Sequence, residues 1–447
     1  MKNAVSGLGL APDAAMITFP IDMFLPGSDI GPLKARKQEI YNGLTHWKSD
    51  FKAAAPTKST MLCVEGASYE DALVKANNFL LTNLWGDGLP MWPATRERVD
   101  WILKGSALPR THMLGKFPPR GGLTTVETCA VALAMAGGRP EYLPVLVAAV
   151  DACFDPSTVF DQLQATSGGP FPAVIVNGPI ARQIRVNSGF GLLGPDPQHP
   201  AGASIGRALR LMQQNVGGAL PGVGTMAIFG AMRYTNAVFA EDDEGLPPGW
   251  QPHATQRHGF APGTNSVSVV FASGATNVRR RGAKKETPEE DALNGMWRMA
   301  DFMRTPNLAA LAGWEKGTPG IMMIAPIVAR RMAELGWTQN SIREFLWENS
   351  KIPMAQMSRA GAPAWIEIDS NPVTRESINL DPWPICLKPD NIVLVVAGGG
   401  HPTHSYWLQA HSPSVIGRVI RLPETFDELL IQADRDLGCG SDHCAIA

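Results

Sequence analysis

Four short, almost wholly apolar segments constrain the fold of this chain more than any other feature of its sequence. They cover residues 173–176, 266–271, 321–324 and 392–396. Strands that are covered on both faces have this composition, because neither face needs to alternate with polar side chains. Each segment ends in loop-forming residues, such as Asn177-Gly178-Pro179 after the first and Gly398-Gly399-Gly400 after the last. The sequence therefore predicts four buried strands followed by shaped loops.

Helical patterns occupy the chain before and between these strands. The predicted helices cover 68–81, 95–103, 124–136, 141–154, 202–214, 288–302, 326–335 and 339–350. Alternation of strands and helices predicts the α/β class, with a layered, mostly parallel or mixed sheet and flanking helices. Ligands of such sheets gather beyond the carboxyl ends of the strands, so the loops after the predicted strands are the candidate sites.

The 447-residue chain divides by composition into three parts. Residues 1–60 are rich in proline and predict an irregular N-terminal arm with one short helix within 33–51. Residues 61–390 form the main α/β body, with a candidate subdomain break near 240–265. Residues 391–447 hold the last strand, a Gly/His-rich loop and a cysteine-bearing tail.

Composition and charge exclude several classes of protein. A hydrophobic content of 45% with a net charge of -2 argues against intrinsic disorder and against binding to nucleic acid by phosphate neutralisation. No apolar run approaches the roughly 18 residues that span a bilayer, and the N-terminus lacks the apolar core of a secretory signal. Six cysteines form no disulfide framework. We expect a cytoplasmic bacterial protein.

The one basic cluster lies at Arg279–Lys285, and an acidic run follows it directly. Two interpretations remain open for this cluster. It is either a solvated loop before a helix or a clamp for an anion such as phosphate.

Several short strings resemble, in combination, an uncharacterised bacterial family associated with, or fused to, UGSC-type proteins. They are GDGLPMWPAT at 86–95, PPRGG at 118–122, AGGRPEYLP at 136–144, VNGPI at 176–180, NSG at 187–189, ELGW at 334–337 and VVAGG at 395–399. The UGSC module is named for its selenocysteine (or Cys)-Gly-Ser-Cys motif, and the resemblance implies thiol or selenol chemistry. This chain has Cys439-Gly440-Ser441-Asp442 at its C-terminus, with Asp442 where the motif has its second cysteine.

The C-terminal tail places Cys439, His443 and Cys444 within six residues. Thiolate and imidazole ligands suit Zn²⁺ or a similar divalent metal. A thiolate near His443 is also a candidate nucleophile, because an imidazolium lowers the pKa of a neighbouring thiol. Three interpretations therefore stay open for the tail: a metal or redox site, a reactive thiol at Cys439, or no defined role.

The loop after the last predicted strand carries Gly399, His401 and His404. Glycines let backbone N–H groups approach an anion closely, and the two histidines suit acid–base catalysis or metal binding. The alternative is an ordinary turn with solvated histidines. This loop is the densest histidine region of the chain, and we take His401 and His404 as candidate catalytic residues and metal ligands.

Polar side chains after the first predicted strand are candidate substrate anchors. Asn177, Asn187 and Ser188 suit an oxyanion or carboxylate, although Asn-Gly and Ser-Gly also favour turns on their own. Arg207, on the helix at 202–214, can bind a carboxylate with two parallel hydrogen bonds or lie on a salt-bridged surface.

Glu127 lies on a predicted helix that is otherwise apolar. A buried carboxylate must be paired or have a raised pKa, and a raised carboxyl group can act as a general acid or base. The alternative is a buried structural pair with Arg120.

These features together predict an enzyme that acts on a small, partly apolar molecule by lyase or hydrolase chemistry, using His/Cys groups or a divalent metal. The G-x-G-x-x-G fingerprint is absent, so we expect no NAD or FAD. The alternative function is a non-catalytic subunit or binding protein that partners a thiol or selenol protein. We expect a homo-oligomer and a small-molecule ligand, with no nucleic-acid or membrane partner.

Overall fold

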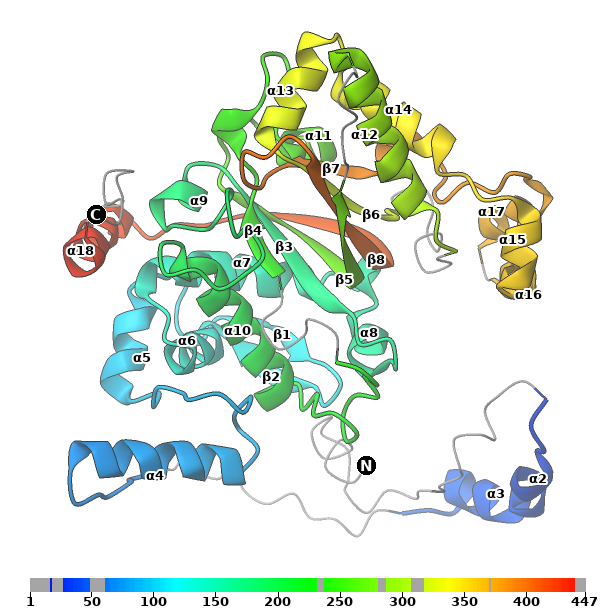
Figure 1. The fold of residues 1–447 in the computed structure, drawn as a ribbon. Helices are drawn as coiled ribbons and strands as arrows, with labels where there is room; N and C mark the ends of the chain where they lie inside the picture. The colour runs from blue at the N-terminus through cyan, green and yellow to red at the C-terminus, as the bar shows by residue number, and fades with distance from the viewer. Residues whose placement is uncertain are drawn as a thin grey trace.

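The computed structural model describes residues 17, 27–48, 61–230, 237–279, 287–306, 317–369 and 371–438. Its centre is a mixed six-stranded sheet with the order β4-β3-β5-β8-β6-β7 (Figure 1). The strands are β3 (Phe171–Asn177), β4 (Ala237–Ala240), β5 (Ser266–Arg279), β6 (Gly320–Ile324), β7 (Val393–Val396) and β8 (His404–Val419). The predicted α/β class is confirmed in its mixed form, because β3–β4 and β6–β7 are parallel and the other three pairs are antiparallel.

The sheet consists of two halves, the first with β3, β4 and β5 and the second with β6, β7 and β8. The strands have the same order in both halves. In each half two parallel strands are followed by a long strand that pairs antiparallel with the first of them. The two long strands, β5 and β8, then pair with each other in the middle of the sheet. β3 pairs with the first part of β5, and β6 pairs with the first part of β8, so the halves are related by an approximate two-fold rotation.

The sheet curls so that its two edge strands approach each other. The β5–β8 register slips twice between Val270 and Gly274, and such irregularities bend strands and increase their twist. Beyond β4, the N–H of Asp242 donates to the carbonyl oxygen of Val396 in β7 over 2.8 Å. The inner faces of both halves therefore share one apolar cluster, which includes Ile175, Phe239 and Met323.

Helices cover the outer face of each half. α5 (Arg96–Leu103), α6 (Val126–Met135), α7 (Leu143–Cys153), α8 (Phe160–Ala165) and α10 (Pro200–Asn215) share a buried cluster with β3, β4 and β5. α12 (Pro288–Met303), α13 (Pro326–Glu334), α14 (Gln339–Asn349), α15 (Met354–Arg359) and α16 (Ala362–Ile368) share another with β6, β7 and the ends of β5 and β8. Figure 1 shows these two groups of helices on opposite sides of the sheet.

The remaining elements lie around this body. They are the hairpin β1 (Met113–Phe117) and β2 (Gly122–Thr125), with α2 (Gly31–Ala35), α3 (Lys37–Thr45), α4 (Tyr69–Thr82), α9 (Ile180–Gln183), α11 (His253–His258), α17 (Pro372–Glu376) and α18 (Phe426–Leu437). Within the described ranges, no helix has the length and apolar character needed to cross a membrane.

The four predicted strands and eight predicted helices are present, most of them within two residues at each end. β5 is the exception among the strands, because it runs on to Arg279. Four further strands were not predicted: β1 and β2 of the hairpin, and β4 and β8 of the central sheet. β4 is only four residues long, and β8 carries polar residues throughout its length.

The shared inner cluster predicts that alanine substitution of two phenylalanines has very different effects on stability. Phe239→Ala removes a ring with 0% exposure from β4, and we expect it to lower the free energy of unfolding by about 3–5 kcal/mol. Phe229→Ala removes a ring that is 97% exposed, and we expect a change within about 0.5 kcal/mol. Chemical denaturation of both variants measures these values, and equal losses would contradict the described core.

Candidate functional site

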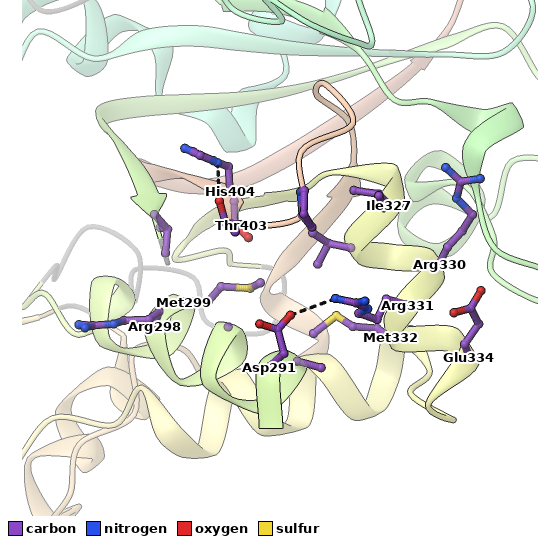
Figure 2. A pocket seen from close by; sticks show the side chains of 16 residues that line it. Asp291, Arg298, Met299, Ile327, Arg330, Arg331, Met332, Glu334, Thr403 and His404 are labelled. Carbon is purple, nitrogen blue, oxygen red and sulfur yellow. Dashed lines mark hydrogen bonds and ion pairs between the residues drawn. The ribbon is translucent and has the colours of Figure 1, made fainter. Parts of the chain in front are cut away.

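A cavity of about 410 Å³ lies between α12 and α13, beside the start of β8. Figure 2 shows its lining from close by. Apolar side chains come from both helices, among them Met299, Ile327 and Met332. Thr403 comes from the loop that follows β7, and His404 is the first residue of β8. The volume is at the small end of the range for ligand sites, and an apolar lining with a few polar groups is typical of them.

His404 belongs to a tight group with His401 and Thr403. The Thr403 hydroxyl lies 3.0 Å from Nδ1 of each histidine, and the two Nδ1 atoms are 3.2 Å apart. The backbone N–H of Thr403 donates to Nδ1 of His401 over 3.4 Å, so this nitrogen carries a lone pair. A proton on Nδ1 of His404 would then lie between the rings and would leave a lone pair on Nε2 of neutral His404.

The surroundings of His404 favour its neutral form. Burial lowers the pKa of His404 below its ordinary value, and the neighbouring His401 and Arg279 lower this pKa further. An imidazole that is neutral at pH 7 can accept a proton, which is the property a general base needs. The predicted acid–base role of His404 therefore has a suitable protonation state.

Charged side chains line the same cavity from its two helices. Arg298 and Asp291 come from α12, and Arg330, Arg331 and Glu334 come from α13. Arg331 Nη1 lies 3.1 Å from Asp291 Oδ2, and this ion pair joins the two helices (Figure 2). The cavity lining thus combines hydrocarbon side chains, one histidine and the Arg331–Asp291 ion pair.

The loop that carries the histidines is fixed by contacts with the first half of the sheet. The N–H of Gly398 donates to the carbonyl oxygen of Ser188 over 2.7 Å. At Gly399 an added Cβ would lie 2.2 Å from a ring carbon of the exposed Phe190, so a larger residue there would displace that ring. The loops after β3 and β7 therefore meet. The prediction of one site at the strand-end loops requires this contact.

A second polar cluster lies where β3, β4 and β7 end. Glu241, which follows β4, is buried and accepts hydrogen bonds through both carboxylate oxygens. The donors are Asn177 Nδ2 at 2.7 Å, the N–H of His253 at 2.6 Å and the N–H of Val396 at 3.3 Å. Asn177 Nδ2 also donates to Asp243 over 2.8 Å. Asn177 was predicted as a substrate anchor. In the structure its amide instead donates hydrogen bonds to both Glu241 and Asp243.

Burial dominates the electrostatics of this cluster. Burial and the nearby Asp243 raise the pKa of Glu241 to about 8, against the effect of its three hydrogen bonds. Burial also raises the pKa of Asp243. The pKa of His253 falls well below its ordinary value for the same reason, with further contributions from His258, Arg257 and Arg343. Burial therefore favours the neutral forms of Glu241, Asp243 and His253.

The other predicted anchors have partners within the chain. Asn187 donates to the carbonyl oxygen of Phe190 over 2.7 Å and accepts from the N–H of Gly189 over 2.7 Å, which is turn chemistry. Arg207 does bind a carboxylate with two hydrogen bonds, but the carboxylate is Asp87 of this chain, at 2.7 and 2.9 Å. Arg207 also donates to two carbonyl oxygens of the same loop.

Two expectations for Glu127 are wrong. The carboxylate lies on the first turn of α6, its side chain is 40% exposed, and its partner is Arg110 rather than Arg120. Arg110 also pairs with Asp100 at 3.1 Å. The apolar composition of α6 suggested burial, but Glu127 lies on the exposed side of the first turn, next to the buried Val126.

The predicted tail residues Cys439, His443 and Cys444 lie outside the described residues, so their metal or thiol role stays a prediction. Of the predicted metal ligands, the structure brings His401 and His404 together. Among the residues it describes, no three His, Cys, Asp or Glu side chains are arranged to hold a metal ion.

Sequence reasoning missed Glu241, Asp243 and Arg331. The signal for the first two was available, because the acidic run Glu241-Asp242-Asp243-Glu244 directly follows the apolar segment Ala237–Ala240. That segment is too short to stand out as a strand. Arg331 carried no local signal, since its place in the cavity lining depends on how α13 packs.

Comparison of the chain with protein-family models, with curated proteins and with solved structures finds no match. The functional argument therefore rests on the geometry of the cavity and its side chains.

The raised pKa of Glu241 predicts a specific dependence of stability on pH. The folded chain keeps a proton on Glu241 up to about pH 8, whereas the unfolded chain releases it near 4.5. Stability is therefore lost as pH rises through this window, by up to about 1.4 kcal/mol per pH unit. Glu241→Gln removes this titration, and denaturation from pH 5 to 8 should give a flatter curve.

Glu244→Gln is the matched control, because the Glu244 side chain is 74% exposed. This variant should keep the pH dependence of the unchanged chain. Parallel curves for Glu241→Gln and the unchanged chain would show that Glu241 does not hold the proton.

Proposed function

We propose that the protein is an enzyme that acts on a small, partly apolar molecule in the cavity between α12 and α13, by lyase or hydrolase chemistry. The observation that carries this proposal is the orientation of His404, whose Nδ1 is held by Thr403 and His401 beside that cavity. This arrangement leaves Nε2 as the proton acceptor. The apolar side chains that line the cavity provide the surface for the rest of the molecule.

His404 acts as the general base in this proposal. In a hydrolysis Nε2 takes a proton from water while the water oxygen bonds to the carbonyl carbon, and the proton then passes to the leaving group. In a lyase reaction Nε2 takes a proton from carbon, the C–H electron pair becomes a double bond, and the leaving group departs. His401 supports either step by fixing the proton on Nδ1 of His404.

A non-catalytic role beside a thiol or selenol protein is the second candidate. It is favoured by helices α2 and α3, in which no residue is buried. Tyr41 and Leu44 are 54% and 82% exposed there. Apolar side chains on such a segment suit contact with another protein. Turnover by the purified chain alone would count against this candidate.

The enzyme proposal predicts that turnover depends on His404. We would incubate the purified chain with small carboxylic acids, esters and amides and follow product formation by NMR. His404→Ala should lower turnover by about a hundredfold or more, because the proton acceptor is lost. Activity of the unchanged chain should fall as pH drops through the lowered pKa of His404, below the ordinary value of 6.5.

His112→Ala is the control, because His112 is an exposed histidine outside the cavity lining. It should retain full turnover. Equal turnover in His404→Ala and the unchanged chain, with both folded, would remove the assignment of His404.

A further inference from the structure

The C-terminal part of α10 carries buried polar atoms that have no hydrogen-bond partner. Arg210 is 7% exposed and Gln213 is 0% exposed. Nη1 of Arg210 and both Nε2 and Oε1 of Gln213 are buried and have no partner among the described residues. The two side chains are three residues apart in one helix, so they are neighbours on its surface. Three unpartnered polar atoms are therefore gathered within one helical turn.

The positive charge of Arg210 also lacks a paired carboxylate. Burial lowers the pKa of Arg210, and the negative charge of Asp87 opposes this shift. Both oxygens of Asp87 are, however, bonded to Arg207, at 2.7 and 2.9 Å. Two guanidinium groups thus share the charge of one buried carboxylate. A buried charge is costly unless an opposite charge pairs with it, so the surplus at Arg210 favours an anionic ligand.

A third guanidinium group, that of Arg120, lies at the turn that follows α10. Arg120 belongs to the β1–β2 hairpin beside α10 (Figure 1), and its N–H donates to the carbonyl oxygen of Gly217 over 2.9 Å. A Cβ added at Gly218 would lie 2.5 Å from Nε of Arg120, and this Nε is buried and unpartnered. The N–H of Ala219 donates to the carbonyl oxygen of Gln213, which folds the turn back onto α10. Arg120 is half-buried and adds positive charge at this end of the helix.

We propose that Arg210 and Gln213 form a binding site for a small oxyanion that also carries an O–H group, as hydrogen phosphate does. Arg210 Nη1 and Gln213 Nε2 donate to oxygens of the anion, and its O–H donates to Gln213 Oε1. An amide presents its donor and its acceptor side by side, which matches an oxygen and a neighbouring O–H on one phosphorus atom. A water molecule could satisfy Gln213, but it would leave the charge of Arg210 without a counter-charge.

This site goes beyond the proposed function, because it lies in the other half of the molecule from the cavity between α12 and α13. α10 shares a buried cluster with β3, β4 and β5, whereas α12 and α13 share another with β6 and β7. The two assignments therefore fail separately. Absence of His404-dependent turnover would remove the catalytic proposal and leave phosphate binding at Arg210 unaffected.

Binding of phosphate and sulfate to the full chain at pH 7 tests this inference. The two ions have nearly the same shape, but sulfate carries no O–H group at this pH. Isothermal titration calorimetry should show phosphate binding about tenfold tighter or more, because Gln213 Oε1 lacks a donor when sulfate is bound. Arg210→Met should lower phosphate affinity about tenfold or more. Gln213→Leu should lower phosphate affinity and remove the preference over sulfate.

Thermal unfolding without phosphate separates a ligand-binding arginine from a structural one. Arg210→Met replaces an unpartnered buried cation by an apolar side chain of similar length, so the unfolding temperature should stay the same or rise. Arg207→Met, on the same helix, leaves the buried Asp87 without its partner and should lower the unfolding temperature by several degrees. A similar fall in Arg210→Met would show that the chain itself pairs with Arg210, and would overturn the inference.

Arg359→Met is the control for the affinities, because Arg359 is an exposed arginine on α15, and this variant should bind phosphate as the unchanged chain does. Three further results would overturn the inference: no binding of phosphate to the unchanged chain, unchanged phosphate affinity in Arg210→Met, or equal affinity for phosphate and sulfate. Gln213→Leu tests the site independently of the arginine charge, and unchanged phosphate affinity in this variant would also contradict it.

Discussion

The buried carboxylate of Glu241 is the interaction on which the arrangement of the two halves depends. It lies directly after β4 and accepts hydrogen bonds from Asn177 beside β3, from the N-terminus of α11 and from β7. Removing a carboxyl group from water is costly, and these donors offset part of that cost. The donors reach Glu241 only while β3, β4 and β7 end at the same place. The hydrogen bonds to this one carboxyl group therefore fix where strands from both halves meet.

That meeting point also positions the cavity. The loop from β7 to β8 leaves the Glu241 cluster, passes Ser188 and Phe190, and then delivers Thr403 and His404. One side of the cavity is thus set by contacts with the first half of the sheet, and its other walls are helices of the second half. The two polar groups have different characters: Glu241 is buried among one side-chain donor and two backbone donors, whereas His404 and Arg331 line a cavity.

Much of the fold could be predicted from the sequence, and less of the site. Strands buried on both faces, such as β3 and β6, are apolar throughout and therefore recognisable. β8 was missed because its first part alternates polar and apolar residues and a proline follows, although both parts pair with β5. His401 and His404 were found because they are neighbours in sequence. Arg331 and Asp291 were not, because their contact joins two helices across 40 residues. Arg207 was recognised as a carboxylate binder, but pattern alone does not say that the carboxylate is Asp87.

The paired long strands β5 and β8 have a consequence for how this chain comes apart. They join the halves at the centre of the sheet, while the Glu241 contacts join them at its edges, and the cluster around Phe239 is enclosed between the two. Unfolding of either half alone would expose the inner apolar surface of the other half to water. We therefore expect the two halves of the sheet to unfold together, so that loss of tertiary order is shared between them rather than local.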